Sequence, residues 1–250
     1  MNVSLPAHAV SRLRAARLTR STKPFLARGG SQGERCAGCR LILSHCLCDL
    51  RLRVPTRAAV CLIMAENEAL KPSNTGWLIA DVVPDTMAFE WARTAPDSAM
   101  LALLADPQWQ PYVVFPGEFV APERVVSELL PPVADKRPLF ILLDATWSEA
   151  RKIFKKSPYL LQFPVLSLTP EHMSRYRLRR SRREDHLCTS EVAALCFSLA
   201  GEAHVAEMLE AYLDVYSEHY LRAKLQQKLD LEDAVHLRLR GLMQTIQPQI

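Results

Sequence analysis

Short apolar runs alternate with amphipathic segments through the middle of the chain. The apolar runs are rich in β-branched and aromatic residues and fall at 58–64, 111–115, 138–143 and 164–168. Runs of this length and composition are typical of the buried strands of a parallel sheet. The segments between them space their apolar residues as helices do, at 77–83, 97–105, 121–130 and 147–156. Alternating strands and helices predict an α/β core with a mostly parallel sheet.

The two ends of the chain follow other patterns. Residues 1–33 are rich in Arg, Ser and Gly without sustained periodicity, so we expect a flexible basic arm. Three C-terminal segments are expected to be helical: 189–201, 204–226 and, more weakly, 231–242. The pattern divides the chain into the arm, a cysteine-rich segment, a core and a helical extension. These parts span 1–33, 34–52, 53–202 and 203–250.

Composition is that of an ordinary globular protein. The chain has 250 residues, of which 49% are hydrophobic and 23% charged, which is ample for a sizeable core. No apolar run approaches the roughly 20 residues that a membrane-spanning helix needs. The basic N-terminus lacks the apolar stretch of a secretory signal. We therefore expect a cytoplasmic protein without membrane association or an obligate protein partner.

Four of the seven cysteines are crowded into one short segment with the spacing C-x2-C-x6-C-x-C. They are Cys36, Cys39, Cys46 and Cys48. Two close cysteine pairs can supply the four thiolates of a tetrahedral structural zinc site. A chain without an export signal is less expected to form disulfides. Segment 34–52 thus predicts a zinc-binding knuckle, with chance-spaced buried thiols or a redox pair as the alternatives.

Asp144 comes directly after the apolar run 138–143. Ligands of open α/β sheets bind at the carboxyl ends of the strands, where this carboxylate could bond a ribose, hold an ammonium group or accept a proton. It could instead only favour the N-terminus of the following helix. Thr146 and Glu149 match a capping box at that helix start. Trp147 either packs in the core or stacks on a base or adenine ring.

Two further loops follow predicted strands. Ser73, Asn74, Thr75 and Gly76 precede a helix, and such a loop offers backbone N–H groups to a phosphate, a carboxylate or a ribose. Phe115, Pro116, Gly117 and Glu118 form a predicted turn with an acid beside it. Either loop alone is compatible with ordinary capping or turning. Together with Asp144 they predict a ligand site at one edge of the sheet.

The net charge of +4 is mild, but six arginines fall within nine residues. The run comprises Arg175, Tyr176, Arg177, Arg179, Arg180, Arg182 and Arg183. Arginine binds phosphates bidentately and stacks on bases, so the run predicts an RNA-binding surface. The alternative is a solvated basic face.

These motifs, taken together, resemble the DTW-domain family. The chain contains "SNTG", "FPGE", "DATW", "SRYRLRR" and "LCTSE" behind the four cysteines, and the likeness covers about residues 35–200. The family takes its name from the Asp-x-Thr-Trp that is Asp144, Thr146 and Trp147 here. Within it, the chain looks most similar to bacterial tRNA-uridine aminocarboxypropyltransferases.

The resemblance implies both a fold and an activity. The fold would be SPOUT-like, with a trefoil knot at the cofactor site. The activity would transfer the 3-amino-3-carboxypropyl group of S-adenosylmethionine to N3 of a uridine in the tRNA variable loop, at tRNA position 47, releasing 5′-methylthioadenosine. Asp144 would act as the general base, with Thr146 and Trp147 beside it in the catalytic motif.

Cofactor contacts are also implied by the resemblance. They would come from Ser73, Asn74, Thr75, Gly76, Phe115, Pro116, Gly117, Glu118, Leu187 and Thr189. Two rival functions remain open at this point. One is a SPOUT-type RNA methyltransferase, and the other is a non-enzymatic RNA-binding protein that contains zinc.

Overall fold

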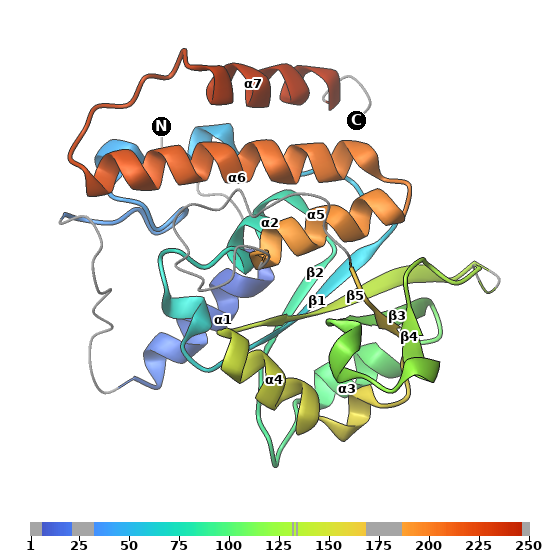
Figure 1. Ribbon diagram of the computed structural model, residues 1–250. Coiled ribbons are helices and arrows are strands. Elements are labelled where there is room, and N and C mark those ends of the chain that lie inside the picture. The colour runs from blue at the N-terminus through green and yellow to red at the C-terminus, as the bar shows by residue number, and fades with distance from the viewer. Residues whose placement is uncertain (1–6, 22–32, 132, 134, 169–186, 247–250) are drawn as a thin grey trace.

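A six-stranded sheet forms the centre of the molecule (Figure 1). The computed structural model describes residues 7–21, 33–131, 133, 135–168 and 187–246. The strands are β1 (Ala59–Met64), β2 (Thr86–Glu90), β3 (Trp109–Val114), β4 (Val125–Val126), β5 (Arg137–Asp144) and β6 (Val165–Leu166). Their order is β2-β1-β5-β3-β6-β4, and every pairing is parallel. The predicted α/β core with a parallel sheet is confirmed.

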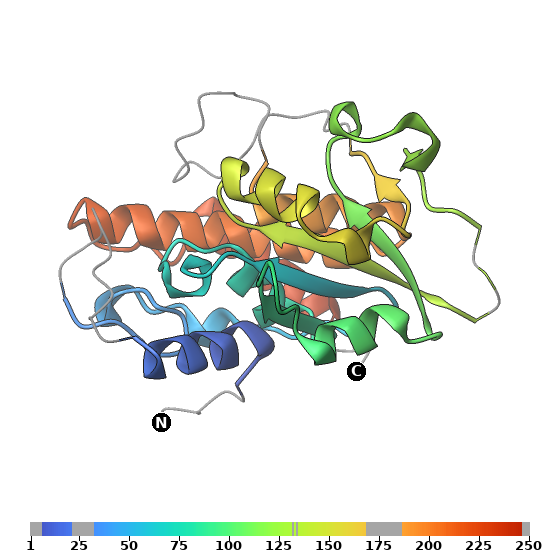
Figure 2. The ribbon, with the colours of Figure 1, turned by 90° about the horizontal axis from the view of Figure 1, so that it is seen from below.

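Helices cover both faces of the sheet (Figures 1 and 2). They are α2 (Gly76–Val82), α3 (Ser98–Ala105), α4 (Trp147–Lys155), α5 (Thr189–Leu199) and α6 (Ala203–Lys224). On β1, Val60 and Leu62 join the core shared with α2, α5 and α6, whereas Cys61 and Ile63 join the core shared with α3 and α4. Successive side chains of a strand point to opposite faces of the sheet. A strand that is apolar throughout therefore fits a sheet covered by helices on both faces.

One predicted helix is wrong, and one strand was not predicted. The segment 121–130, expected to be a helix, forms a 3-10 turn at Pro122–Arg124 and then β4. Its two β-branched valines pair with β6 at the sheet edge, and this tertiary pairing overrides the helical spacing. The edge strand β2 was not predicted, because its residues after Thr86 are only half-buried and lack a strong apolar run.

The N-terminal segment contains a helix, α1 (Ala9–Thr19), so the expected flexible arm is wrong for these residues. Val10 is completely buried, and α1 packs beside β2 and α2 (Figure 2). The His8 ring meets the Trp77 ring edge-on, with centroids 4.5 Å apart. Arg14 Nη1 donates to the carbonyl of Leu70 at 2.8 Å. These tertiary contacts stabilise a helix that the sequence pattern alone does not reveal.

The last described helix, α7 (Ala234–Ile246), lies along the outer side of α6 (Figure 1). Two buried histidines join the two helices, with His219 Nε2 and His236 Nε2 2.8 Å apart. His219 Nδ1 also donates to the carbonyl of His45 at 3.0 Å, which links both helices to the cysteine segment. Within the described part of the chain, no helix combines the length and the apolar character required to span a membrane.

Candidate active site

Asp144 ends β5 and is only 3% exposed. Asn74 Nδ2 donates to its Oδ2 at 2.7 Å, and Thr189 Oγ1 donates to its Oδ1 at 2.7 Å. Residues from three distant parts of the sequence therefore meet at one carboxylate. The parallel register explains the meeting, since Asp144 pairs with Met64 at the carboxyl ends of two neighbouring strands. Asp144 and loop 73–76 thus meet at the sheet edge, as their places after two strands predict, whereas the binding of a ligand there stays a prediction.

The loop 73–76 packs directly against this carboxylate. A Cβ added to Gly76 would overlap Asp144 Oδ2 and lie 3.2 Å from Leu62 Cδ1, so only glycine allows the approach. Asn74 also caps α2, because its Oδ1 accepts from the Trp77 N–H at 2.9 Å. Thr75 is buried and within hydrogen-bonding reach of the Cys188 thiol. Ser73 is half-buried at the start of the loop.

Gly76→Ala is expected to destabilise the protein by about 1–3 kcal/mol, because the new methyl group overpacks a site that has no room. Gly241→Ala is the matched control. Gly241 is an exposed position in α7 with no atom within 4 Å of the added Cβ, so this change should stabilise by about 0.5–1 kcal/mol. Urea unfolding curves of both variants measure the difference. Equal changes in stability of the same sign in the two variants would contradict the close contact between Gly76 and Asp144.

Thr146 caps α4 in a capping box with Glu149, as its sequence predicts. The Thr146 N–H donates to Glu149 Oε2 at 3.0 Å, and the Thr146 hydroxyl also donates to that carboxylate. Burial alone would raise the pKa of Glu149, but these hydrogen bonds and the charges of Lys71 and Lys152 lower it. Glu149 is thus held as a charged carboxylate at the start of the helix.

Trp147 lies with aromatic side chains of the "FPGE" loop and of α4. Its ring stacks on Phe115 at 5.5 Å and 11°, and it meets Phe119 edge-on at 5.6 Å. Phe115 stacks in turn on Phe154 at 4.3 Å. The half-buried Trp147 therefore serves packing, one of the two roles that the sequence left open, and it joins the "DATW" and "FPGE" motifs.

The "FPGE" loop follows β3, the strand next to β5. The Gly117 N–H donates to Ser167 Oγ at 2.9 Å, and a Cβ at Gly117 would lie 3.0 Å from Val125. Pro116 and Glu118 are exposed. Ser167, which sequence reasoning missed, thus anchors the loop; its place as the one polar residue of the predicted strand 164–168 was the available signal.

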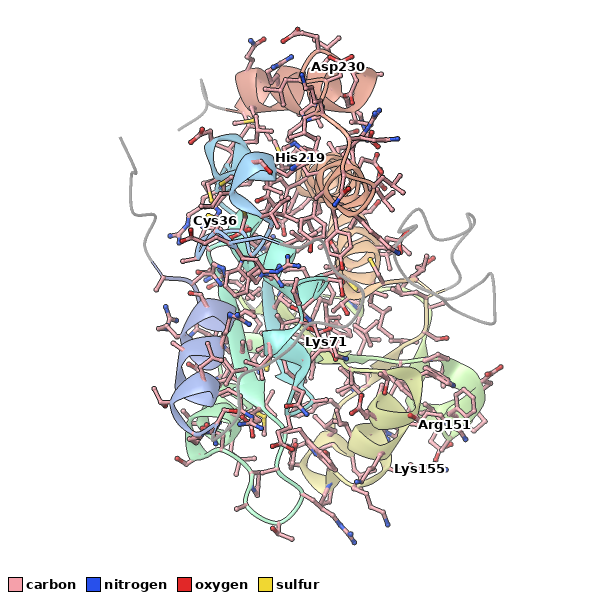
Figure 3. All side chains as sticks on the ribbon, turned by 90° about the vertical axis from the view of Figure 1, so that its left-hand side faces the viewer. Cys36, Lys71, Arg151, Lys155, His219 and Asp230 are labelled. Atoms are coloured by element: carbon pink, nitrogen blue, oxygen red, sulfur yellow. The ribbon has the colours of Figure 1, made fainter. Side chains whose placement is uncertain are left out.

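Two charged residues near Asp144 were also missed. Glu68 follows β1 and forms an ion pair with Lys71. Burial and the nearby charge of Asp144 raise the pKa of Glu68, while Lys71 opposes the rise. Figure 3 shows Lys71 between the cysteine cluster, marked by Cys36, and the α4 side chains. The charged stretch between the first strand and "SNTG" was the signal for both residues.

In the "LCTSE" motif, Leu187 is half-buried and precedes Cys188, the N-cap of α5. The Cys188 N–H donates to Glu191 Oε2 at 2.7 Å, which completes a second capping box. The predicted RNA-binding residues lie outside the described residues, and their role remains a prediction. They are Arg175, Tyr176, Arg177, Arg179, Arg180, Arg182 and Arg183.

The four predicted metal ligands come together. The Sγ atoms of Cys36, Cys39, Cys46 and Cys48 all lie within 4.8 Å of one another. The Cys36–Cys48, Cys39–Cys46 and Cys36–Cys46 separations are 3.6, 3.7 and 3.5 Å. A tetrahedral zinc with Zn–S bonds of about 2.3 Å requires sulfurs about 3.8 Å apart. The donor set and its spacing therefore fit a closed structural zinc site.

Arg40 connects this cluster to the loop 71–76. It follows Cys39, has a left-handed φ of 67°, and is 2% exposed. Its Nη1 donates to the Lys71 carbonyl at 2.7 Å and its Nη2 to the Asn74 carbonyl at 3.2 Å. The guanidinium also lies 4.1 Å from the centroid of Trp77. The fold of the cysteine segment thus braces the loop that supports Asp144.

Fold and site together define an α/β protein with a buried carboxylate at the strand ends and a four-cysteine cluster beside it. The DTW domain model matches residues 33–221, and the chain belongs to the DTW-domain family. The resemblance found in the motifs is confirmed. No solved structure matches the chain. Family membership is consistent with a tRNA-modifying transferase.

Proposed function

We propose that this protein transfers the 3-amino-3-carboxypropyl group of S-adenosylmethionine to N3 of a uridine in the tRNA variable loop, releasing 5′-methylthioadenosine. The observation that carries the proposal is the buried Asp144, which joins the "SNTG" and "LCTSE" loops in a member of the DTW-domain family. The reaction would take place in the cytoplasm.

The chemistry of the residues at the site fits this cofactor. The half-buried ring of Trp147 is the aromatic surface that suits an adenine ring, and the buried Phe115, stacked between Trp147 and Phe154, supports it. The first turns of α4 and α5 supply N–H groups that suit the cofactor's carboxylate. When bound, the cofactor supplies the electrophilic carbon of its aminocarboxypropyl chain. Ser73, Thr75, Gly76, Pro116, Gly117, Glu118 and Leu187 remain proposed contacts of the cofactor.

Asp144 is the proposed acceptor of the uridine N3 proton. Asn74 and Thr189 both donate to it, so the geometry accommodates the charged carboxylate that a base must be. A positioned general base contributes about 10²–10⁴-fold to a rate. Glu68 is a second carboxylate nearby; burial and the charge of Asp144 raise its pKa, while Lys71 opposes the rise.

The remaining parts of the proposal concern the core and the RNA. A parallel sheet with ligand-capable loops at its carboxyl ends supports a SPOUT-like core, and the trefoil knot is part of this proposal. The arginine run 175–183 would hold tRNA phosphates. Phosphate contacts release counterions, so tRNA affinity should fall steeply as salt concentration rises.

Mass spectrometry of nucleosides tests the reaction. Unmodified tRNA incubated with the protein and S-adenosylmethionine should yield a uridine heavier by one aminocarboxypropyl group, together with 5′-methylthioadenosine. A methylated nucleoside and S-adenosylhomocysteine would instead establish the methyltransferase alternative. An absence of cofactor binding, with tRNA binding retained, would establish the non-enzymatic RNA-binding alternative.

A further inference from the structure

Helix α4 presents a cluster of positive charge next to the candidate active site. Ala150 and Ile153 face the core, while Lys152, Lys155 and Lys156 at its C-terminal end are exposed and Arg151 is half-buried. Figure 3 shows Arg151 and Lys155 projecting from the outer side of the helix. Among the residues that the structure describes, none of these four side chains has an ion-pair partner. We call the four residues the α4 basic face.

This arrangement costs stability unless an anion lies nearby. Lys152–Lys156 and Arg151–Lys155 are like-charge pairs at i,i+4 spacing, each destabilising an isolated helix by about 0.2–0.5 kcal/mol. The helix dipole offsets only part of this cost at the C-terminal turn. The one acidic side chain of α4, Glu149, is engaged in the capping box with Thr146. Within α4, Glu149 interacts electrostatically with Lys152 alone of the four, and no ion pair within the helix neutralises Arg151, Lys155 or Lys156.

Aromatic rings lie beside the positive charges of the α4 basic face, and they indicate which class of anionic ligand it binds. Arg151 lies 4.8 Å from the centroid of Phe119, and Lys152 lies 5.7 Å from that of Trp91. Trp147, half-buried in the first turn, joins the same aromatic cluster. Arginine and aromatic rings beside several lysines suit an RNA backbone and its bases better than a small anion.

The α4 basic face lies on the helix that begins next to Asp144. Helix α4 begins three residues after Asp144, and a rise of about 1.5 Å per residue places Lys155 about 12 Å along the helix from Trp147. An RNA chain bound along α4 would thus pass close to Asp144. We propose that the α4 basic face binds the phosphates flanking the target nucleotide, an inference that rests on the proposed function.

The test compares two double variants that lose the same charge. Lys155→Gln/Lys156→Gln changes the α4 basic face. Lys224→Gln/Lys228→Gln changes exposed lysines at and beyond the end of α6 and is the matched control. Affinity for tRNA is measured by filter binding over a range of salt concentrations, S-adenosylmethionine binding by calorimetry, and folding by thermal unfolding.

The α4 variant should lose about tenfold or more in tRNA affinity near physiological salt, and its slope of log affinity against log salt should become shallower by about 2. Cofactor affinity and folding should not change, since surface substitutions of this kind alter stability by about 0.5 kcal/mol or less. The control should keep the wild-type slope.

Equal losses in both double variants would overturn the proposal, because a diffuse effect of net charge would then explain binding. An unchanged slope in the α4 variant, or a wild-type protein that does not bind tRNA, would also overturn it. If the wild-type protein binds tRNA through α4 but forms no aminocarboxypropyl uridine, the binding surface stands while the proposed reaction fails.

Discussion

Asp144→Asn is expected to lower the rate of aminocarboxypropyl transfer by about 10²–10⁴-fold, because the amide cannot accept the uridine N3 proton. The measurement is single-turnover formation of the modified nucleoside at saturating cofactor and tRNA. The amide oxygen still accepts one of the two hydrogen bonds that Asn74 and Thr189 donate. We therefore expect a loss of only about 1–3 kcal/mol in stability, from the donor that remains unpaired.

Thr189→Val is the matched control for Asp144. It removes one of the same hydrogen bonds with a side chain of similar shape, and it keeps the carboxylate. Its transfer rate should stay much closer to that of the wild type than the rate of Asp144→Asn. If the two variants lost activity equally while both remained folded, Asp144 would act by holding the loops together and not by accepting a proton.

Cys39→Ser is expected to remove the metal and destabilise the protein strongly, because a structural zinc site contributes its binding free energy to folding. Metal analysis should give one equivalent of zinc for the wild type and a reduced content for the variant. The variant should also bind S-adenosylmethionine weakly, because the cysteine segment carries Arg40 and Arg40 braces the loop 71–76.

Arg40→Met separates these two effects. It keeps all four thiolates but removes the hydrogen bonds to the carbonyls of Lys71 and Asn74. Zinc content should stay at one equivalent, whereas cofactor affinity should fall by about 10–100-fold, the equivalent of roughly 1.4–2.8 kcal/mol. Unchanged cofactor affinity in a folded Arg40→Met protein would show that the cysteine segment does not support this loop.

The sequence predicts those parts of the site that lie at or just after the end of a strand. Asp144 was predictable because it ends a run of buried apolar residues, and loop 73–76 because it opens a helix after a strand. The parallel pairing of β1 and β5 then brings the two together. The four cysteines were predictable because close spacing puts ligands into tight turns.

The parts that were missed depend on contacts between distant segments. Arg40 and Arg14 reach the loop 68–74 from other elements, and no local pattern marks an arginine that will be buried against carbonyl groups. Trp147 was predicted as either core or cofactor contact, and only the tertiary structure shows its stacking on Phe115. The short edge strands carry too little periodicity to be distinguished from helix or loop.

Helix α1 has a practical consequence for how the protein is handled. The region that matches the family begins at residue 33, after α1 ends at Thr19. Yet His8 covers the ring of Trp77 and Arg14 holds the carbonyl of Leu70, on either side of the "SNTG" motif. A recombinant fragment cut to the family limits would therefore lack two supports of the loop 71–76, and weak cofactor binding by such a fragment would reflect the truncation and not the properties of the full chain.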